Sequence, residues 1–193
     1  MEGFSVYFQL GLEHIADFNG YDHMLFIITL CAVYFWSSWK NVVILVTAFT
    51  IGHSVTLALS ALDIFRLPAN LIETLIPITI FLTAMYNLSI AGTPVQKGVQ
   101  WNYGIALFFG FIHGMGFSNF FRGLHPDTES IVAELFAFNV GLEVGQRLIV
   151  IAFMLLYALL DTLFFIRRRD WTLFWSGAGA AVSGIMILEG IFG

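Results

Sequence analysis

The chain has 193 residues, of which 59% are hydrophobic and only 11% charged, and its formal net charge is −5. This balance excludes an ordinary soluble domain, in which about 25% of residues are charged. It also argues against a nucleic-acid partner, because such proteins present a basic surface. We therefore expect one integral membrane domain over residues 1–193, with the lipid bilayer as its surroundings.

Apolar runs predict an all-α polytopic membrane helix bundle, because a helix needs about 20 apolar residues to cross a hydrocarbon core of ~30 Å. Before the first long run, the stretch 4–15 carries Glu13 and His14 and has no basic residues ahead of it. We interpret this stretch as a short lateral helix and not as a cleaved signal. The six predicted transmembrane helices are 20–37, 41–62, 70–91, 101–121, 143–166 and 171–192.

Basic residues predict the orientation, because Lys and Arg accumulate in cytoplasmic loops. Lys40, Lys97 and the run 167–169 fall in the first, third and fifth connections, whereas the second and fourth hold only Arg66 and Arg122. Both termini are therefore expected on the outer side of the membrane. The outer loops are acidic, which would concentrate cations there, although ordinary solvation explains these charges about as well.

Cys31 is the only cysteine, so the chain can form no internal disulfide and no cage of thiolates around a metal. Any metal ion bound by this chain would be held by nitrogen and oxygen atoms.

The first polar cluster joins His14 to the pair Asp22-His23. In one unbroken helix the two histidines would point to opposite sides, because nine residues correspond to about 900° of rotation. Asn19-Gly20 offers a break where the chain can turn, so the histidines could converge. Imidazole and carboxylate together suit Ni²⁺, Co²⁺, Zn²⁺ or Fe²⁺. The alternative is that Asp17, Asn19 or Asp22 caps the first membrane helix and His23 only forms a local hydrogen bond.

The second and third clusters place histidines inside predicted spans. His53 and His113 both lie about 18 Å from the cytoplasmic ends of their helices, at 1.5 Å per residue. Their matching depth permits a shared site facing the bundle interior. Thr50 and Ser54 share the face of His53, so an interhelical hydrogen bond is the competing interpretation. Near His113, the pair Gly110/Gly114 is more typical of close helix packing than of chemistry.

The fourth cluster lies in an apolar tract that runs from about 131 to 166, so the exact start of the fifth membrane helix is open. Asn139, Glu143 and Gln146 fall within about 60° of one another on one helix face. Counting back from the basic run places Glu143 near the outer boundary, level with Asp22. The competing interpretation is that Glu143 only neutralises Arg147 one turn away.

These motifs together resemble the HupE/UreJ family, small polytopic proteins associated with hydrogenase and urease. Seven residues separate His14 from Asp22, which is longer than in the hydrogenase-associated members, and Met115-Gly116-Phe117 follows His113. The chain therefore looks like the second, divergent branch of the family. The resemblance rests on His14 with Asp22-His23, on Phe49-Thr-Ile-Gly-His53-Ser54, on Gly110-Phe-Ile-His113-Gly114-Met-Gly116-Phe117 and on Phe138-Asn-Val-Gly-Leu-Glu143-Val-Gly-Gln146.

The resemblance implies a nickel or cobalt permease, or a metal-supply accessory, in the bacterial inner (cytoplasmic) membrane. It also leaves room for a homo-oligomer or a partner metalloprotein system. Thr50, Ser54, Asn139 and Gln146 would support the metal ligands from the second coordination shell. The implied metal ligands are His14, Asp22, His23, His53, His113 and Glu143.

Our leading hypothesis is therefore a permease for a divalent transition metal, with its site in the outer half of the membrane. The rival is an intramembrane zinc hydrolase in which three protein ligands hold Zn²⁺ and Glu143 or Asp22 is the general base. The paired histidines of alkaline ceramidase and adiponectin-receptor hydrolases, four residues apart in a late helix, do not occur here. A third hypothesis is a structural or sensory subunit that carries no ion.

Overall fold

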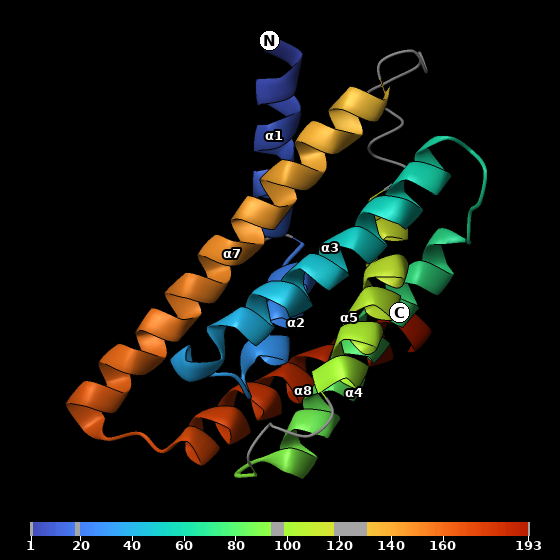
Figure 1. Ribbon diagram of the computed structural model, residues 1–193. Coiled ribbons are helices and arrows are strands. Elements are labelled where there is room, and N and C mark those ends of the chain that lie inside the picture. Colours follow the sequence, from blue (N-terminus) through green and yellow to red (C-terminus); the bar gives the residue numbers. More distant parts are fainter. Residues whose placement is uncertain (1, 18–19, 94–98, 118–130, 193) are drawn as a thin grey trace.

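The computed structural model describes residues 2–17, 20–93, 99–117 and 131–192, and within them every regular element is helical (Figure 1). The expected all-α class is therefore confirmed for the described chain. A 3₁₀ turn, Trp36–Ser38, precedes the third of the α-helices. The α-helices are α1 Glu2–Ile15, α2 Asp22–Cys31, α3 Trp39–Ala61, α4 Ala69–Ile90, α5 Val99–Gly116, α7 Ile131–Phe164 and α8 Arg168–Phe192.

Four helical stretches in the described chain are long and apolar enough to cross a membrane: Trp36–Ala61, Ala69–Ile90, Ile131–Phe164 and Arg168–Phe192. Three of them correspond to the predicted spans 41–62, 70–91 and 171–192. Composition and helix length thus agree on an integral membrane protein.

The first predicted span, 20–37, contains a shorter helix than expected. α2 has only 10 residues, which is about 15 Å at 1.5 Å per residue and too short to cross a bilayer alone. Its end lies inside the bundle, where neighbouring helices satisfy its carbonyl groups. Asn87 Nδ2 donates to the Thr29 carbonyl at 2.6 Å, and Thr172 Oγ1 donates to the Ala32 carbonyl at 2.8 Å. These side chains let α2 stop early without leaving buried acceptors unpaired.

The fifth predicted span, 143–166, begins too late. α7 has 34 residues and begins at Ile131, so the whole apolar tract is one helix. Its length of about 51 Å exceeds the hydrocarbon core. The fourth predicted span, 101–121, corresponds to α5, which ends at Gly116, and the rest of that span beyond residue 117 lies outside the described residues.

The helices associate most extensively as three pairs: α3 with α5, α1 with α7, and α4 with α8. In Figure 1, α1 and α2 follow one another along the bundle, from the end where the N-terminus lies toward the opposite end. α1 is packed lengthwise on the first half of α7, so it is part of the bundle.

Glycines bring α3 and α5 into backbone contact. A Cβ atom at Gly110 would clash with the carbonyl oxygen of Phe49, and one at Gly114 would clash with that of His53. Gly52 on α3 faces the backbone of α5 in the same way. The expectation that Gly110 and Gly114 serve packing is therefore confirmed.

The pair α1 and α7 is built on the same principle. A Cβ atom at Gly11 would clash with the carbonyl oxygen of Phe138, and one at Gly141 would clash with that of Phe8. Small residues that allow such close approach are a common basis of helix association in membranes. This contact fixes the end of α1, where His14 lies.

Basic residues gather at one end of the bundle. The Arg168 guanidinium lies 4.9 Å from the centre of the Phe35 ring, just before α3, and the Arg169 side chain lies against Gly92, just after α4. The connections that precede α3, follow α4 and precede α8 therefore meet at the same end. This arrangement agrees with the alternation of basic and non-basic connections that the sequence predicts.

Replacing Gly110 by alanine should destabilise the bundle, because the added methyl group meets only backbone atoms of α3. Overpacking of this kind costs about 1–3 kcal/mol. Gly104→Ala is the matched control on the same helix, since nothing lies within 4 Å of a Cβ there, and it should be neutral or stabilise by up to about 1 kcal/mol. Unfolding of detergent-solubilised protein, followed by circular dichroism, measures both; equal effects would contradict the backbone contact.

Candidate metal centre

Three histidines from three different helices converge in the described structure. His14 lies in the last turn of α1, His23 in the first turn of α2, and His53 in the middle of α3. One ring nitrogen from each lies within 4.8 Å of the others. The His14 and His23 rings are 4.5 Å apart between centroids, so the two histidines do meet across residues 16–21, as the sequence led us to expect.

His113 joins the group from α5. Its ring centroid is 5.2 Å from that of His23, and the two rings are nearly perpendicular. His53 and His113 are both fully buried. The close approach of α3 and α5 through Gly110 and Gly114 brings both residues to the same level of the bundle.

The ring nitrogens of this cluster lack ordinary hydrogen-bond partners. Five of them are buried without any partner among the described residues: Nε2 of His14, Nε2 of His23, both nitrogens of His53 and Nδ1 of His113. A buried polar atom without a partner is unfavourable by about 1–3 kcal/mol. Because a neutral imidazole carries one N–H, one of the two His53 nitrogens is a donor, and up to four of the five atoms can offer a lone pair to a metal ion.

Asp22 orients the His23 ring. Its Oδ1 atom lies 3.1 Å from Nδ1 of His23. Because an ionised carboxylate can only accept, Nδ1 carries the proton, and in a neutral imidazole the lone pair is then on Nε2. That nitrogen is one of the five without a partner. A carboxylate behind a histidine is a common second-shell arrangement at metal sites, so the structure places Asp22 behind His23.

Thr79 on α4 orients the His113 ring, as Asp22 orients His23. The sequence analysis did not identify Thr79. Its hydroxyl donates to the Ile76 carbonyl at 2.7 Å, so its oxygen accepts from Nε2–H of His113 at 2.9 Å. The lone pair of His113 is therefore on Nδ1, again a nitrogen without a partner. The signal was present as the four-residue spacing of Thr79, Thr83 and Asn87 on one helix face.

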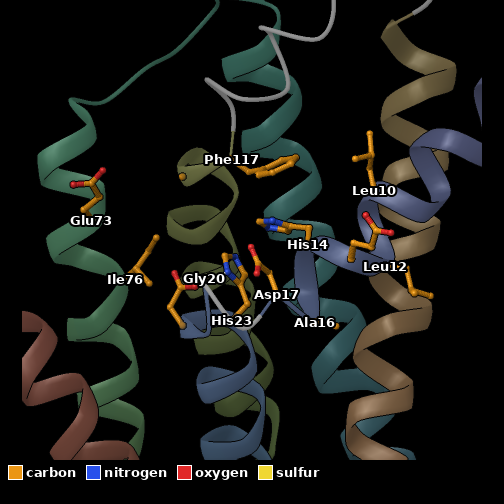
Figure 2. A pocket seen from close by; sticks show the side chains of 13 residues that line it. Leu10, Leu12, His14, Ala16, Asp17, Gly20, His23, Glu73, Ile76 and Phe117 are labelled. Atoms are coloured by element: carbon orange, nitrogen blue, oxygen red, sulfur yellow. Dashed lines mark hydrogen bonds and ion pairs between the residues drawn. The ribbon is translucent and has the colours of Figure 1, made fainter.

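A pocket of about 870 Å³ opens beside His14 and His23. Figure 2 shows the two imidazoles next to each other beneath Phe117, with Asp17 beside His23 and Glu73 on α4 at the far side of the pocket. Four carboxylate residues line this pocket, namely Glu13, Asp17, Asp22 and Glu73. A cation approaching the histidines from this side would therefore pass through an acidic vestibule.

Glu143 is not part of the histidine group. Its carboxylate accepts from Thr47 at 2.7 Å, from Thr50 at 2.5 Å and from Arg147 at 2.6 Å. The ion pair with Arg147 is the one that the sequence offered as the alternative to a metal-ligand role for Glu143. Thr47, which sequence reasoning missed, lies one turn before Thr50 on the same face of α3. These hydrogen bonds connect α7 to α3.

The hydrogen bonds of the four expected supporting residues, as far as the described residues show them, go to groups other than the histidine nitrogens. Thr50 lies between Glu143 and Gln146, with its oxygen 2.9 Å from Oε1 of Gln146. Ser54 donates to the Thr50 carbonyl at 2.6 Å, and Asn139 donates to the Leu135 carbonyl at 2.7 Å. Each of these contacts is within one helix or between α3 and α7.

The donor set fits a divalent transition metal. Metal–imidazole bonds are about 2.0–2.1 Å long, so three nitrogens bound to one ion lie about 3.3–3.6 Å from one another. Side-chain movements of somewhat less than about 1 Å would bring His14, His23 and His53 to that separation from their present limit of 4.8 Å. Neutral imidazoles suit nickel, cobalt and zinc better than magnesium or calcium, which prefer oxygen ligands.

A comparison with known protein families covers all the helices that carry the four histidines. The family model described as HupE / UreJ protein matches residues 1–190, which includes α1, α2, α3 and α5 with all four histidines. No curated protein and no solved structure gives a significant match. Because the match covers nearly the whole chain, and the resemblance of the histidine motifs points the same way, the chain belongs to the HupE/UreJ family.

Proposed function

We propose that this protein is a membrane permease for a divalent transition-metal ion of the nickel or cobalt type. The family implies nickel or cobalt transport or an accessory function. The observation that carries the proposal is the convergence of His14, His23 and His53, whose free ring nitrogens lie within 4.8 Å of one another. His113 is the fourth ligand in this proposal, and Asp22 positions His23.

The ion reaches the histidines through the acidic pocket. The pocket lies at the end of the bundle opposite the arginine-rich connections, which is the outer end by the distribution of Lys and Arg. Its carboxylates attract the hydrated cation, and the imidazoles then replace part of its water shell. A permease must also release its ion, so a small number of ligands with some retained water suits transport.

The inward route follows α4. Thr79, Thr83 and Asn87 are buried at four-residue spacing, so they form one polar stripe directed away from His113. Thr83 and Asn87 also line a cavity of about 270 Å³ near the opposite end, together with Asn102. Phe26 is fully buried and lies against His113 at 4.9 Å between ring centroids.

The bundle crosses the membrane six times in this proposal, with α1 and α2 forming one interrupted crossing. Together they have 24 residues, from 14 in α1 and 10 in α2, which is about 36 Å of helix. Interrupted helices are typical of transporter binding sites near the membrane centre. His14 and His23 lie on either side of this interruption. The location is the bacterial cytoplasmic membrane, with both termini outside.

The alternative function is an intramembrane zinc hydrolase, which is favoured by one observation. Three histidine ligands beside an open pocket match the ligand number of catalytic zinc sites. The general bases considered for such an enzyme are already engaged, because Asp22 bonds His23 and Glu143 bonds Thr47, Thr50 and Arg147. The permease is therefore the better-supported function.

His53→Ala should lower nickel affinity by on the order of 100-fold, since even second-shell partners contribute 10–100-fold to metal affinity. Cellular uptake of the ion should fall with it. Titration calorimetry of the purified protein and uptake of radioactive nickel measure the two effects. Ser54→Ala is the neighbouring control, because its hydroxyl bonds only the Thr50 carbonyl among the described residues. Unchanged binding in correctly folded His53→Ala would contradict the site.

Thr83→Leu tests the inward route. The larger apolar side chain should fill the cavity beside Asn87, so uptake should be largely lost while nickel affinity in detergent stays the same. Thr162→Leu is the matched control, because Thr162 makes the same bond to a carbonyl one turn earlier but is exposed on α7. Normal uptake by Thr83→Leu would mean that the ion leaves by another path.

Glu143→Gln tests whether Glu143 is a metal ligand or a structural residue. Thr47 donates to Oε1 of the carboxylate and Thr50 donates to Oε2. Glutamine keeps one of these two acceptors, so we expect nickel affinity within about threefold of the parent and a modest loss of stability. Glu143→Ala should destabilise more, because it leaves no acceptor for Thr47, Thr50 or Arg147. Calorimetric titration and thermal unfolding of both variants provide the comparison. Abolished nickel binding by a well-folded Glu143→Gln protein would place Glu143 among the ligands.

A further inference from the structure

A second cavity, remote from the histidines, lies at the arginine-rich end of the bundle. Its volume is about 320 Å³, and it is formed where residues 33–38, the end of α4 and the start of α8 meet. Arg168, Arg169, Ser37 and Ser38 are among the residues that line it. No carboxylate lines it among the described residues.

The two arginines differ from their neighbour Arg167. Nε of Arg167 pairs with Asp170 Oδ2 at 2.9 Å, and Arg167 does not line the cavity. Arg168 and Arg169 have no carboxylate partner in the described part of the chain. Two cations therefore line one cavity, and no carboxylate of the described residues is paired with either of them.

Both side chains contact residues that line the cavity, and Arg168 also shares a side-chain hydrogen bond with Tyr157. The Arg168 guanidinium lies over the Phe35 ring, 4.9 Å from its centre. Arg169 lies across Gly92, where a Cβ atom would come within 3.2 Å of its Cδ atom. Gly92 has a φ of +91°, which other residues rarely adopt, so this position both turns the chain and leaves room for the arginine.

We propose that this cavity binds the phosphate group of an anionic phospholipid. Arginine donates paired hydrogen bonds to phosphate oxygens, and serine hydroxyls add further donors. The position favours a lipid over free phosphate, because the cavity lies at the end of apolar membrane helices. Trp36, next to Phe35, is 60% exposed there, and tryptophan is typical of the headgroup level. Basic pockets on the cytoplasmic side commonly hold lipid headgroups.

The inference is independent of metal transport, since no residue of the cavity belongs to the histidine site. Its test compares the full chain with Arg168→Gln/Arg169→Gln and with Arg167→Gln as the matched control. Each protein is placed in nanodiscs of phosphatidylcholine alone or with phosphatidylglycerol added. Thermal unfolding and native mass spectrometry then report stabilisation and retained lipid.

The expected result is an upward shift of several degrees with phosphatidylglycerol for the parent and for Arg167→Gln, and loss of that shift in the double variant. An equal shift in the double variant would overturn the site, because it would show only general attraction to charge. The same shift with inorganic phosphate in phosphatidylcholine discs would overturn the lipid as ligand. If the double variant does not fold, Arg169→Gln alone is measured in its place. Loss of the phosphatidylglycerol-dependent shift would then support the site, and an unchanged shift would overturn it.

Discussion

The structure depends on imidazole nitrogens that are buried together in an apolar bundle and that have no hydrogen-bond partner among the described residues. Burying a polar atom without a partner is costly. A single divalent ion accepts lone pairs from several imidazoles at once, which would offset that cost. The packing of the helices holds these nitrogens close together.

Glycine is what allows the histidine-bearing helices to come close enough. Gly110 and Gly114 place α5 against the backbone of α3, and Gly11 and Gly141 place α1 against α7. Glu143 then connects α7 to α3 through Thr47 and Thr50. The two glycine-packed pairs are thus joined, and His14 reaches the level of His53. Acidic residues surround the approach to this level, whereas the arginines lie at the other end of the bundle.

The sequence predicted the features that depend on local pattern. The length of the apolar runs predicted a helical membrane protein. The predicted spans 41–62, 70–91 and 171–192 agree closely with α3, α4 and α8. Polar residues within apolar spans pointed to His23, His53 and His113, and the glycine near residue 20 suggested how His14 could join them. The resemblance of these motifs to the HupE/UreJ family was confirmed over residues 1–190.

The remaining features depend on contacts between helices, which one sequence does not reveal. α2 ends early because Asn87 and Thr172, distant in the chain, bind its terminal carbonyls. From the sequence alone, a metal-ligand role of Glu143 could not be distinguished from an ion pair with Arg147. Both interpretations place the carboxylate on the same face of the helix. Thr79 was missed because a threonine in an apolar helix looks ordinary until His113 is placed beside it.

X-ray absorption spectroscopy of the nickel-loaded protein in detergent tests the central claim most directly. The account predicts one ion per chain with three or four nitrogen neighbours at about 2.0–2.1 Å and the multiple scattering typical of imidazole rings. A first shell made only of oxygen atoms, or nickel retained equally well when His23 and His53 are both replaced by alanine, would contradict it.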